Sequence, residues 1–216
     1  MYKAAAASEW RSARRQSARD AIVDAAWRVV HAEGLAGLSL RDLAKVAGIS
    51  TPTVYAYFES KNAIYDAMFG RAATEFADRM TEPYEAVDPR EVLIAGFRRF
   101  IEFCTTDPAR YQLLFQRTIP GFEPSPESFA PAVRALDSSC QRLAANGIRD
   151  PRHVDMWTAV TTGVVDQQIS NDPGGRRWTD LVESAVDMFL AHCQGANRPR
   201  PRATTAKGRR RAPTNP

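Results

Sequence analysis

The chain has 216 residues, of which 44% are hydrophobic and 25% charged, and its formal net charge is +4 at pH 7. These values are typical of a globular protein with room for one or two domains, and they argue against a chain disordered throughout. No stretch approaches the roughly 18 apolar residues that a membrane span requires, and the N-terminal stretch lacks the apolar core of a secretory signal, so we expect a cytoplasmic protein outside the membrane.

The charge is unevenly distributed along the sequence. Residues 1–63 carry nine Lys/Arg and six Asp/Glu, residues 64–196 carry 13 and 19, and residues 197–216 carry seven and none. The ends are therefore basic and the middle is acidic, which indicates nucleic-acid contact at the N-terminal end. The last segment is rich in Pro, Arg, Thr and Ala and cannot bury a core, so we expect a disordered basic tail.

Cysteine and histidine give no sign of disulfide bonds or of a metal site. Cys104, Cys140 and Cys193 are far apart and form no C-x-x-C pair, so we expect three reduced thiols. The three histidines share no spacing typical of metal ligands. The sequence also has no nucleophile–base pair, phosphate-binding loop or paired carboxylates, so we expect no enzymatic activity, no metal and no cofactor.

Apolar residues recur with helical spacing along most of the chain, so we predict an all-α fold. A first helix is expected over residues 17–33, because Gly34 follows its apolar stripe. Ser39 and Ser50 are expected N-caps of two short helices. A fourth helix is expected from Lys61 to about residue 82.

The second part of the chain contains five further predicted helices. Two Asp-Pro pairs indicate helix starts at residues 89 and 108, since Pro suits the first helical position. Residues 119–131 contain four prolines and a glycine, so we expect a loop there. The remaining predicted helices cover residues 131–146, 151–170 and 176–193.

Residues 40–59 predict two short helices joined by a tight turn. Ala44 is small where the two helix backbones must approach, and Gly48 stands where the turn requires a positive φ. The apolar side of a small shared core is expected from Leu43, Ala47, Ile49, Val54 and Phe58. This spacing is that of a helix-turn-helix, which places its second helix in the major groove of DNA.

The outward residues of this motif are the candidate DNA contacts. Thr51, Pro52 and Thr53 begin the second helix, where hydroxyl and methyl groups suit base edges. Arg41 is the candidate for a bidentate guanine contact, with a solvated charge as the alternative. The other candidate contacts, which include the phosphate contacts, are Ser39, Ser50, Tyr55, Tyr57 and Lys61. Packing is the alternative for both tyrosines.

The central predicted helices are rich in aromatic residues, which either line an apolar ligand pocket or form ordinary core. The candidate pocket residues are Phe97, Phe100, Phe103, Tyr111, Phe115, Trp157 and Thr161. Such a pocket suits a small apolar or aromatic effector. The last two predicted helices carry apolar residues on more than one side, which favours pairing with a second copy of the chain in a homodimer.

Two segments, GLAGLSLRDLAKVAGIS and TPTVYAYFESKNAIYDAM, resemble the TetR family of bacterial transcription repressors over about residues 17–70. Tyr57 stands where that family usually has His. The segment from Asp107 to Phe115, followed by Trp157 through Gly163, is similar to one TetR-type C-terminal ligand-binding class. That class carries His where Thr162 stands here.

The resemblance implies three N-terminal helices that bind DNA, an effector cavity among the remaining helices, and a homodimer in which the last two helices form a four-helix bundle. It also implies that a bound ligand shifts the fourth helix and alters the spacing of the two DNA-binding heads. We therefore expect an N-terminal arm and DNA-binding domain over residues 1–63 and an effector-binding and dimerisation domain over 64–196. The expected function is a repressor that binds an inverted-repeat double-stranded operator. The alternatives are an activator, a helical scaffold without DNA activity, and an enzyme.

Overall fold

The computed structural model describes residues 2–196, with side chains over residues 9–195, so the predicted disordered tail at 197–216 lies outside the described residues. Within that range the fold is all-α, as predicted, and contains no strand. The elements are α1 (Tyr2–Gly37), α2 (Leu40–Ala47), α3 (Thr51–Tyr57), α4 (Lys61–Thr81), α5 (Pro89–Thr106), α6 (Pro108–Phe115), α7 (Pro126–Ala145), α8 (Pro151–Asn171), the short 3₁₀ turn η1 (Thr179–Leu181) and α9 (Val182–Ala196).

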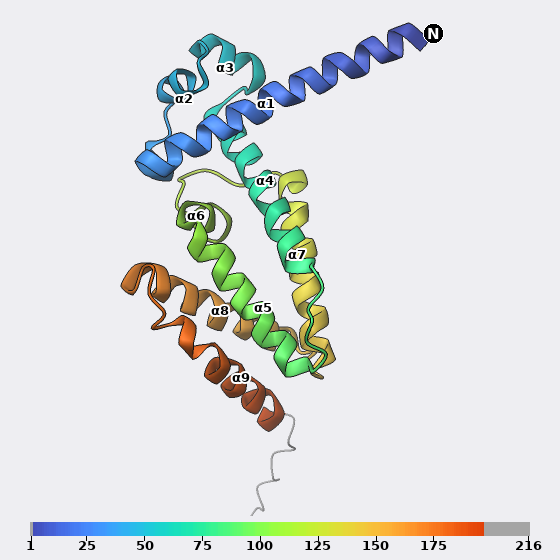
Figure 1. Ribbon diagram of the computed structural model, residues 1–216, viewed down its shortest axis with the longest axis vertical. Helices are drawn as coiled ribbons and strands as arrows, with labels where there is room; N and C mark the ends of the chain where they lie inside the picture. The colour runs from blue at the N-terminus through green and yellow to red at the C-terminus, as the bar shows by residue number, and fades with distance from the viewer. Residues whose placement is uncertain (1, 197–216) are drawn as a thin grey trace, which may run out of the picture.

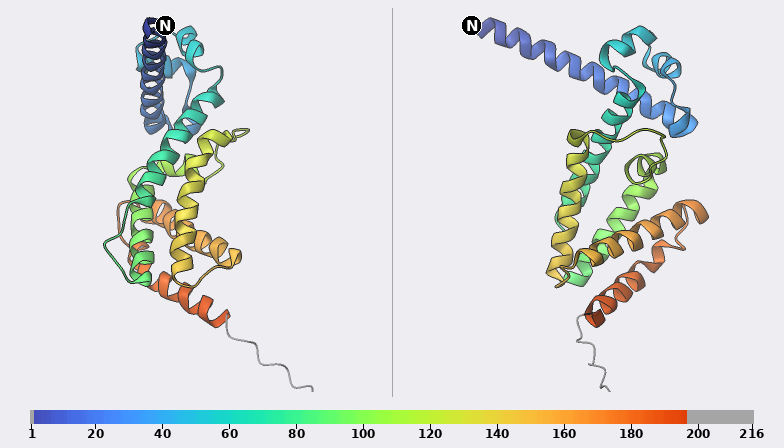
Figure 2. Two further views of the ribbon diagram at one scale, coloured as in Figure 1. Left: turned by 90° about the vertical axis from the view of Figure 1, so that its right-hand side faces the viewer. Right: turned by 180° about the vertical axis from the view of Figure 1, so that it is seen from behind.

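The helices form a small head and a larger body (Figure 1). Helices α1, α2 and α3 make the head, and α4 runs from the head into the body, where α7 packs along it. Helices α5, α8 and α9 lie at the far end, and α6 lies between them and the head. Figure 1 and the right-hand view of Figure 2 show that the N-terminal part of α1 projects well beyond the head.

The head has the shared core that its sequence predicts. Leu43, Val54 and Phe58 are buried together with side chains of α1 and α4, and Ala47 and Ile49 pack against them. The caps are also as predicted: the Ser39 hydroxyl accepts a hydrogen bond from the backbone N–H of residue 42 at 3.1 Å, and the Ser50 hydroxyl accepts one from that of residue 53 at 3.2 Å. Local capping therefore fixes the ends of α2 and α3.

Gly48 ends α2 with φ +68°, in the left-handed region. The backbone N–H of the next residue, Ile49, donates to the Ala44 carbonyl at 3.0 Å. A side chain would be strained at this φ because its β-carbon approaches the following carbonyl. The tight turn of the motif thus depends on this glycine.

Three predicted helix starts are wrong, those of α1, α7 and α9. The first helix begins at Tyr2, not at residue 17, because the preceding segment is rich in strong helix formers and only its lack of an apolar stripe suggested otherwise. Gly34, with φ +75°, marks a kink in α1, not its end. Helix α7 begins at Pro126, so the predicted loop ends early and Pro131 lies inside the helix.

The early start of α7 depends on Asp66 of α4. Ser125 is the N-cap, and its backbone N–H and hydroxyl donate to the Asp66 carboxylate at 2.6 and 2.9 Å. The Ser128 hydroxyl also donates to it, at 2.9 Å. A contact across 59 residues thus sets this helix start. The segment from residue 176 to 181 also differs from the prediction, since it holds only η1 before α9 begins.

The body packs around α5. Phe97 of α5 contacts Trp157 of α8 with ring centroids 5.5 Å apart, and Trp157 contacts Phe189 of α9 at 5.0 Å. Cys104 and Cys193 are buried in the same core, and all three cysteines are free thiols. No helix among residues 2–196 is long and apolar enough to span a membrane.

Replacing Gly48 with Ala will destabilise the chain by about 1–2 kcal/mol, because a β-carbon is strained at positive φ. A β-carbon at Gly48 would meet no neighbouring atom, so the cost comes from the backbone alone. Urea unfolding measures the change. The matched control is Gly195→Ala in α9, which also has open space around it and lacks a positive φ; we expect its effect to stay within about 0.5 kcal/mol. Equal stability of both variants would contradict the assignment.

Candidate nucleic-acid interface and ligand cavity

Helix α3 lies at the outer surface of the head and presents its polar residues there. Tyr55 is 53% exposed and Pro52 is exposed, while Thr51 and Thr53 are half-buried. Val54, between them, is fully buried. One side of α3 therefore anchors the helix in the head and leaves the other side open, as a helix that enters a DNA groove requires.

The remaining candidate DNA contacts differ in how freely their side chains extend. Arg41 is exposed, and its side chain makes no hydrogen bond or ion pair with any residue in the range 9–195. The Lys61 ammonium lies 5.4 Å from the ring centroid of Tyr65. Tyr57 is half-buried and packs against the head core, which is the packing alternative that its sequence left open. The hydroxyls of Ser39 and Ser50 cap helices, as described above.

The projecting part of α1 forms one wall of a groove beside α3. Arg19 donates to the backbone carbonyl of Tyr57, its guanidinium lies 4.1 Å from the Phe58 ring centroid, and Arg15 donates to the carbonyl of Ala56 at 3.5 Å. Arginines at the C-terminal end of α3 satisfy its last carbonyls. The sequence alone does not reveal that these arginines contact the end of α3.

The groove itself is open and partly basic. Its volume is about 730 Å³, and its lining residues are Trp10, Arg11, Arg14, Arg15, Pro52, Thr53, Ala56 and Tyr57. Trp10 was missed by sequence reasoning, which looked for charge in the arm and not for aromatic residues. Three predicted DNA contacts of α3, namely Pro52, Thr53 and Tyr57, thus share a surface with the arm.

A ligand-sized cavity lies in the body, between α4, α5, α7 and α8. Its volume is about 160 Å³, and five of the predicted pocket residues line it: Phe97, Phe100, Phe115, Trp157 and Thr161. Phe103 and Tyr111 lie outside the cavity lining, which corrects the prediction for these two. Phe103 packs instead on Phe76, with ring centroids 5.2 Å apart.

Tyr111 has a different partner, Asp166 of α8. The Tyr111 hydroxyl and the Gln116 side-chain amide both donate to the same Asp166 oxygen at 2.8 Å. Burial, and next the hydrogen bond to Asp166, raise the pKa of Tyr111 above its ordinary value, so the hydroxyl stays protonated and donating at neutral pH. Asp166 therefore ties α8 to the middle and to the C-terminal end of α6.

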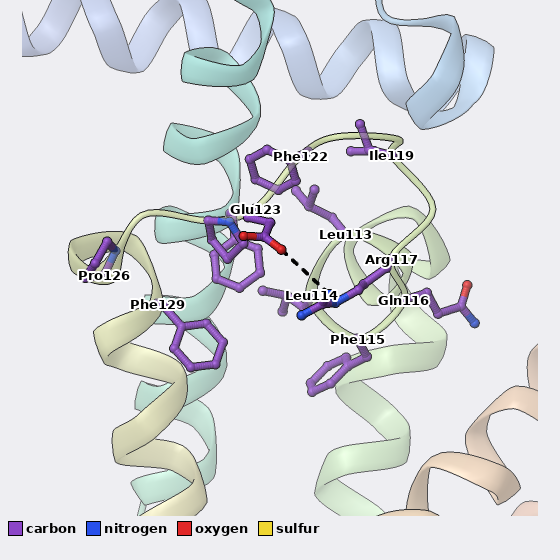
Figure 3. Close-up of a pocket in the computed structure, with 12 residues that line it drawn as sticks. Leu113, Leu114, Phe115, Gln116, Arg117, Ile119, Phe122, Glu123, Pro126 and Phe129 are labelled. Carbon is purple, nitrogen blue, oxygen red and sulfur yellow. Dashed lines mark ion pairs between the residues drawn. The ribbon is translucent and has the colours of Figure 1, made fainter.

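A second hollow, of about 520 Å³, lies under the head between α4, α6 and the start of α7 (Figure 3). Phe69, Leu113, Phe122 and Phe129 are among its lining residues, and Phe115 is shared with the body cavity. Across its mouth, Arg117 and Glu123 form an ion pair at 3.7 Å (Figure 3). Gln116 points away from this hollow, toward Asp166.

Charged side chains connect the start of α6 to the head. The ring Nε2 of His31 in α1 lies 3.0 Å from a carboxylate oxygen of Asp107, and the Arg110 guanidinium lies 2.8 Å from the Glu75 carboxylate of α4. Arg110 also lies 5.5 Å from the ring centroid of Phe103. The start of α6 thus contacts both the head and the body.

The head matches the family model for bacterial regulatory proteins of the tetR family over residues 22–68. The likeness of this chain to the TetR family covers these residues of the head. An uncharacterized HTH-type transcriptional regulator of Mycobacterium tuberculosis is 32% identical over 106 residues, which cover 48% of this chain and 52% of that protein. The chain thus spans about half the length of the curated relatives that it matches first.

Solved TetR-family structures share the whole fold. A TetR family transcription regulator from Marinobacter aquaeolei VT8 superposes with a TM-score of 0.61 at 21% identity, covering 83% of this chain and 97% of that one. The transcriptional regulator FadR from Bacillus subtilis, in complex with stearoyl-CoA, superposes with a TM-score of 0.59 at 19% identity, covering 79% and 97%. At these identities the likeness establishes the fold.

Replacing Asp166 with Ala will destabilise the chain by about 1–3 kcal/mol, because the buried Tyr111 hydroxyl and the Gln116 amide lose their acceptor. Thermal and urea unfolding measure the loss. Asp155→Ala, at an exposed position of the same helix, is the control, and we expect it to change stability by less than about 0.5 kcal/mol. If the two variants are equally stable, Asp166 does not hold α6 against α8.

Proposed function

We propose that this chain is a ligand-responsive transcriptional repressor that binds an inverted-repeat operator as a homodimer and leaves it when a small molecule occupies the body cavity. Residues 1–63 would form the DNA-binding domain, and residues 64–196 the effector-binding and dimerisation domain. The observation that carries the proposal is the family-matched helix-turn-helix, whose α3 is anchored on one side and open on the other.

The contacts proposed for DNA divide into base and phosphate contacts. Arg41, Thr51, Pro52 and Thr53 would face base edges, because they lie at the starts of α2 and α3. The proposed phosphate contacts are the hydroxyl groups of Ser39, Ser50, Tyr55 and Tyr57 and the ammonium group of Lys61. A dimer doubles these contacts, which matters because the head carries a modest charge.

The proposed dimer surface consists of α8 and α9. Large apolar side chains remain exposed on these helices and on the η1 turn before α9: Met156 of α8 at 37%, Leu181 of η1 at 44% and Met188 of α9 at 60%. Other residues of the two apolar stripes, such as Trp157 and Phe189, are buried within the same chain. The exposed residues therefore provide apolar area for an isologous contact of the kind that forms two-fold dimers.

The proposed ligand response follows from how α4 and α6 connect cavity and head. Phe76 and Met80 of α4 line the cavity, and the same helix begins in the head core. Phe115, at the end of α6, lines it too, while the start of α6 holds the His31 and Glu75 contacts. A ligand that displaces Phe76 or Phe115 would act on helices that position the head. The stearoyl-CoA complex of FadR supports ligand response in this fold.

We expect Arg41→Ala to weaken operator binding about tenfold or more and to relax base preference, because a bidentate base contact is worth roughly 1–3 kcal/mol. Tyr55→Phe should weaken binding less and leave base preference unchanged, because it removes a phosphate contact. Fluorescence anisotropy at fixed salt, on a duplex selected by the full-length protein from a random library, measures both.

Arg149→Ala is the control for these variants, because Arg149 is an exposed arginine in the loop between α7 and α8, and its loss changes net charge by the same amount as Arg41→Ala. Its affinity should equal that of the wild type. Unchanged affinity in both Arg41→Ala and Tyr55→Phe would remove these residues from the interface, and failure to select any duplex would refute the DNA-binding function.

We expect Met188→Asp to convert the protein to a monomer at micromolar concentration, because it would bury an unpaired charge in the dimer contact. Sedimentation velocity measures the mass. Val87→Asp is the control, since Val87 is 93% exposed in the loop between α4 and α5. Wild-type protein that sediments as a monomer would contradict the dimer, and a dimeric Met188→Asp variant would place the contact elsewhere.

A further inference from the structure

One lining residue of the body cavity, Arg142, packs in a stack with Tyr84 and Arg99, which are not themselves lining residues. Arg142 of α7 lines the cavity beside Gly96 of α5. The Arg142 guanidinium lies 5.4 Å from the ring centroid of Tyr84, and the guanidinium of Arg99 lies 4.0 Å from the same ring. Two positive charges therefore flank one aromatic ring beside the cavity.

Arg142 has no acidic partner in the part of the chain that the structure describes. Its two hydrogen bonds both come from Nη1, to the Met80 carbonyl at 3.2 Å and to the Ser138 hydroxyl at 2.7 Å. Nε and Nη2 find no acceptor within residues 9–195, and no carboxylate lies within 4 Å of the group. Arginine carries five N–H donors, so three of them are left for another acceptor.

Arg99 does not neutralise this stack. Its guanidinium donates only to the backbone carbonyls at the end of α4, those of Arg79, Glu82 and Pro83 at 2.7–3.2 Å. Burial, and further the charge of Arg99, lower the pKa of Arg142, although a guanidinium stays protonated. The stack thus carries positive charge that nearby described residues do not compensate, and an anion would relieve it.

The Tyr84 hydroxyl is a second donor without a partner. It is buried and makes no hydrogen bond with any residue in the described range. A β-carbon placed on Gly96 would lie 3.3 Å from this hydroxyl and 3.5 Å from Arg142 Nε. Because Gly96 has no side chain, the Tyr84 hydroxyl and Arg142 Nε can both pack closely against this point of α5. Buried polar groups of this kind normally find a partner.

The rest of the cavity is small and mostly apolar, with hydroxyl groups only from Ser139 and three threonines, Thr158, Thr161 and Thr162. Phe76, Phe97, Phe100 and Trp157 line it within a volume of about 160 Å³. A cavity of about 150 Å³ lined by apolar side chains holds a molecule the size of benzene. The cavity therefore combines a ring-sized, mostly apolar space with the uncompensated donors of Arg142.

We propose that the effector is a small monocarboxylate with an aromatic ring or a short alkyl chain, whose carboxylate binds to Arg142 and Tyr84 and whose apolar part lies between Phe97, Phe100 and Trp157. The inference rests on the proposed function as a ligand-responsive regulator, whose effector class it names. A guanidinium pairs with a carboxylate through two parallel hydrogen bonds, which a neutral amide cannot reproduce.

Isothermal titration of the full-length protein with matched acids and amides tests this. Phenylacetate and octanoate should bind about tenfold or more tightly than phenylacetamide and octanamide, because only the acids offer a charged acceptor. Equal affinity of acid and amide would overturn the proposal and leave the Arg99–Tyr84–Arg142 stack with a packing role. Absence of binding by either acid would overturn it as well.

Variants then locate the carboxylate. Arg142→Met should remove the preference for acid over amide, while Arg134→Met, at an exposed position of the same helix, should retain it. Tyr84→Phe should weaken acid binding a few-fold without affecting amide binding, and it serves as the test if Arg142→Met fails to fold. An acid preference that survives Arg142→Met or Tyr84→Phe would overturn the assignment of that residue.

The titrations contain no DNA, so their outcome does not depend on whether the protein binds an operator. A protein that binds the acids but selects no operator would keep the carboxylate site and lose the repressor function. A protein that leaves its operator on addition of an amide, and not of an acid, would remain a ligand-responsive regulator and refute the carboxylate site.

Discussion

Helix α4 belongs to two hydrophobic cores, and the arrangement of the whole chain depends on this. Ile64 and Tyr65 are buried in the head, and Ala77 and Met80 are buried in the body. The Tyr65 hydroxyl donates to the Leu35 carbonyl at 2.5 Å, which fixes the start of α4 to α1. Because interiors are close-packed, α4 cannot move in one core without disturbing the other. The orientation of α3 therefore depends on how the body packs.

The second connection between head and body consists of charged groups. Two pairs of charged side chains join the start of α6 to its neighbours. Asp107 contacts His31 of α1, and Arg110 contacts Glu75 of α4. Such partly exposed pairs contribute little stability, typically below about 1 kcal/mol each. They restrain geometry without adding much to the free energy of folding. A ligand with modest affinity can therefore compete with them, whereas it could not break the α4 cores.

The helix-turn-helix was predictable because its signals are local. Ser39, Ser50 and Gly48 each act within a few residues, so capping and φ preference suffice. The starts of α1 and α7 were not predictable in this way. The first is a helix without an apolar stripe, and the second depends on Asp66, far away in sequence.

The cavity shows the same division between local and long-range information. Aromatic residues at helical spacing identified Phe97, Phe100 and Trp157 as lining residues, since periodicity places them on inward faces. Nothing local connects Tyr84 with Arg142, which the fold brings together from the α4–α5 loop and α7. Likewise, Phe103 and Tyr111 are aromatic residues of the kind that line apolar pockets. In the structure, however, Phe103 packs on Phe76, and the Tyr111 hydroxyl donates a hydrogen bond to Asp166. The polar contacts of a helical cavity are therefore harder to predict from sequence than its apolar lining residues.

The burial of cysteine thiols in the body has a consequence for what the protein can sense. Burial raises the pKa of both Cys104 and Cys193, so almost no thiolate forms at these two positions in neutral solution. Peroxides and disulfides react with the thiolate form, so these two buried thiols react slowly with oxidants. Oxidants would therefore leave these two positions of the body core unmodified.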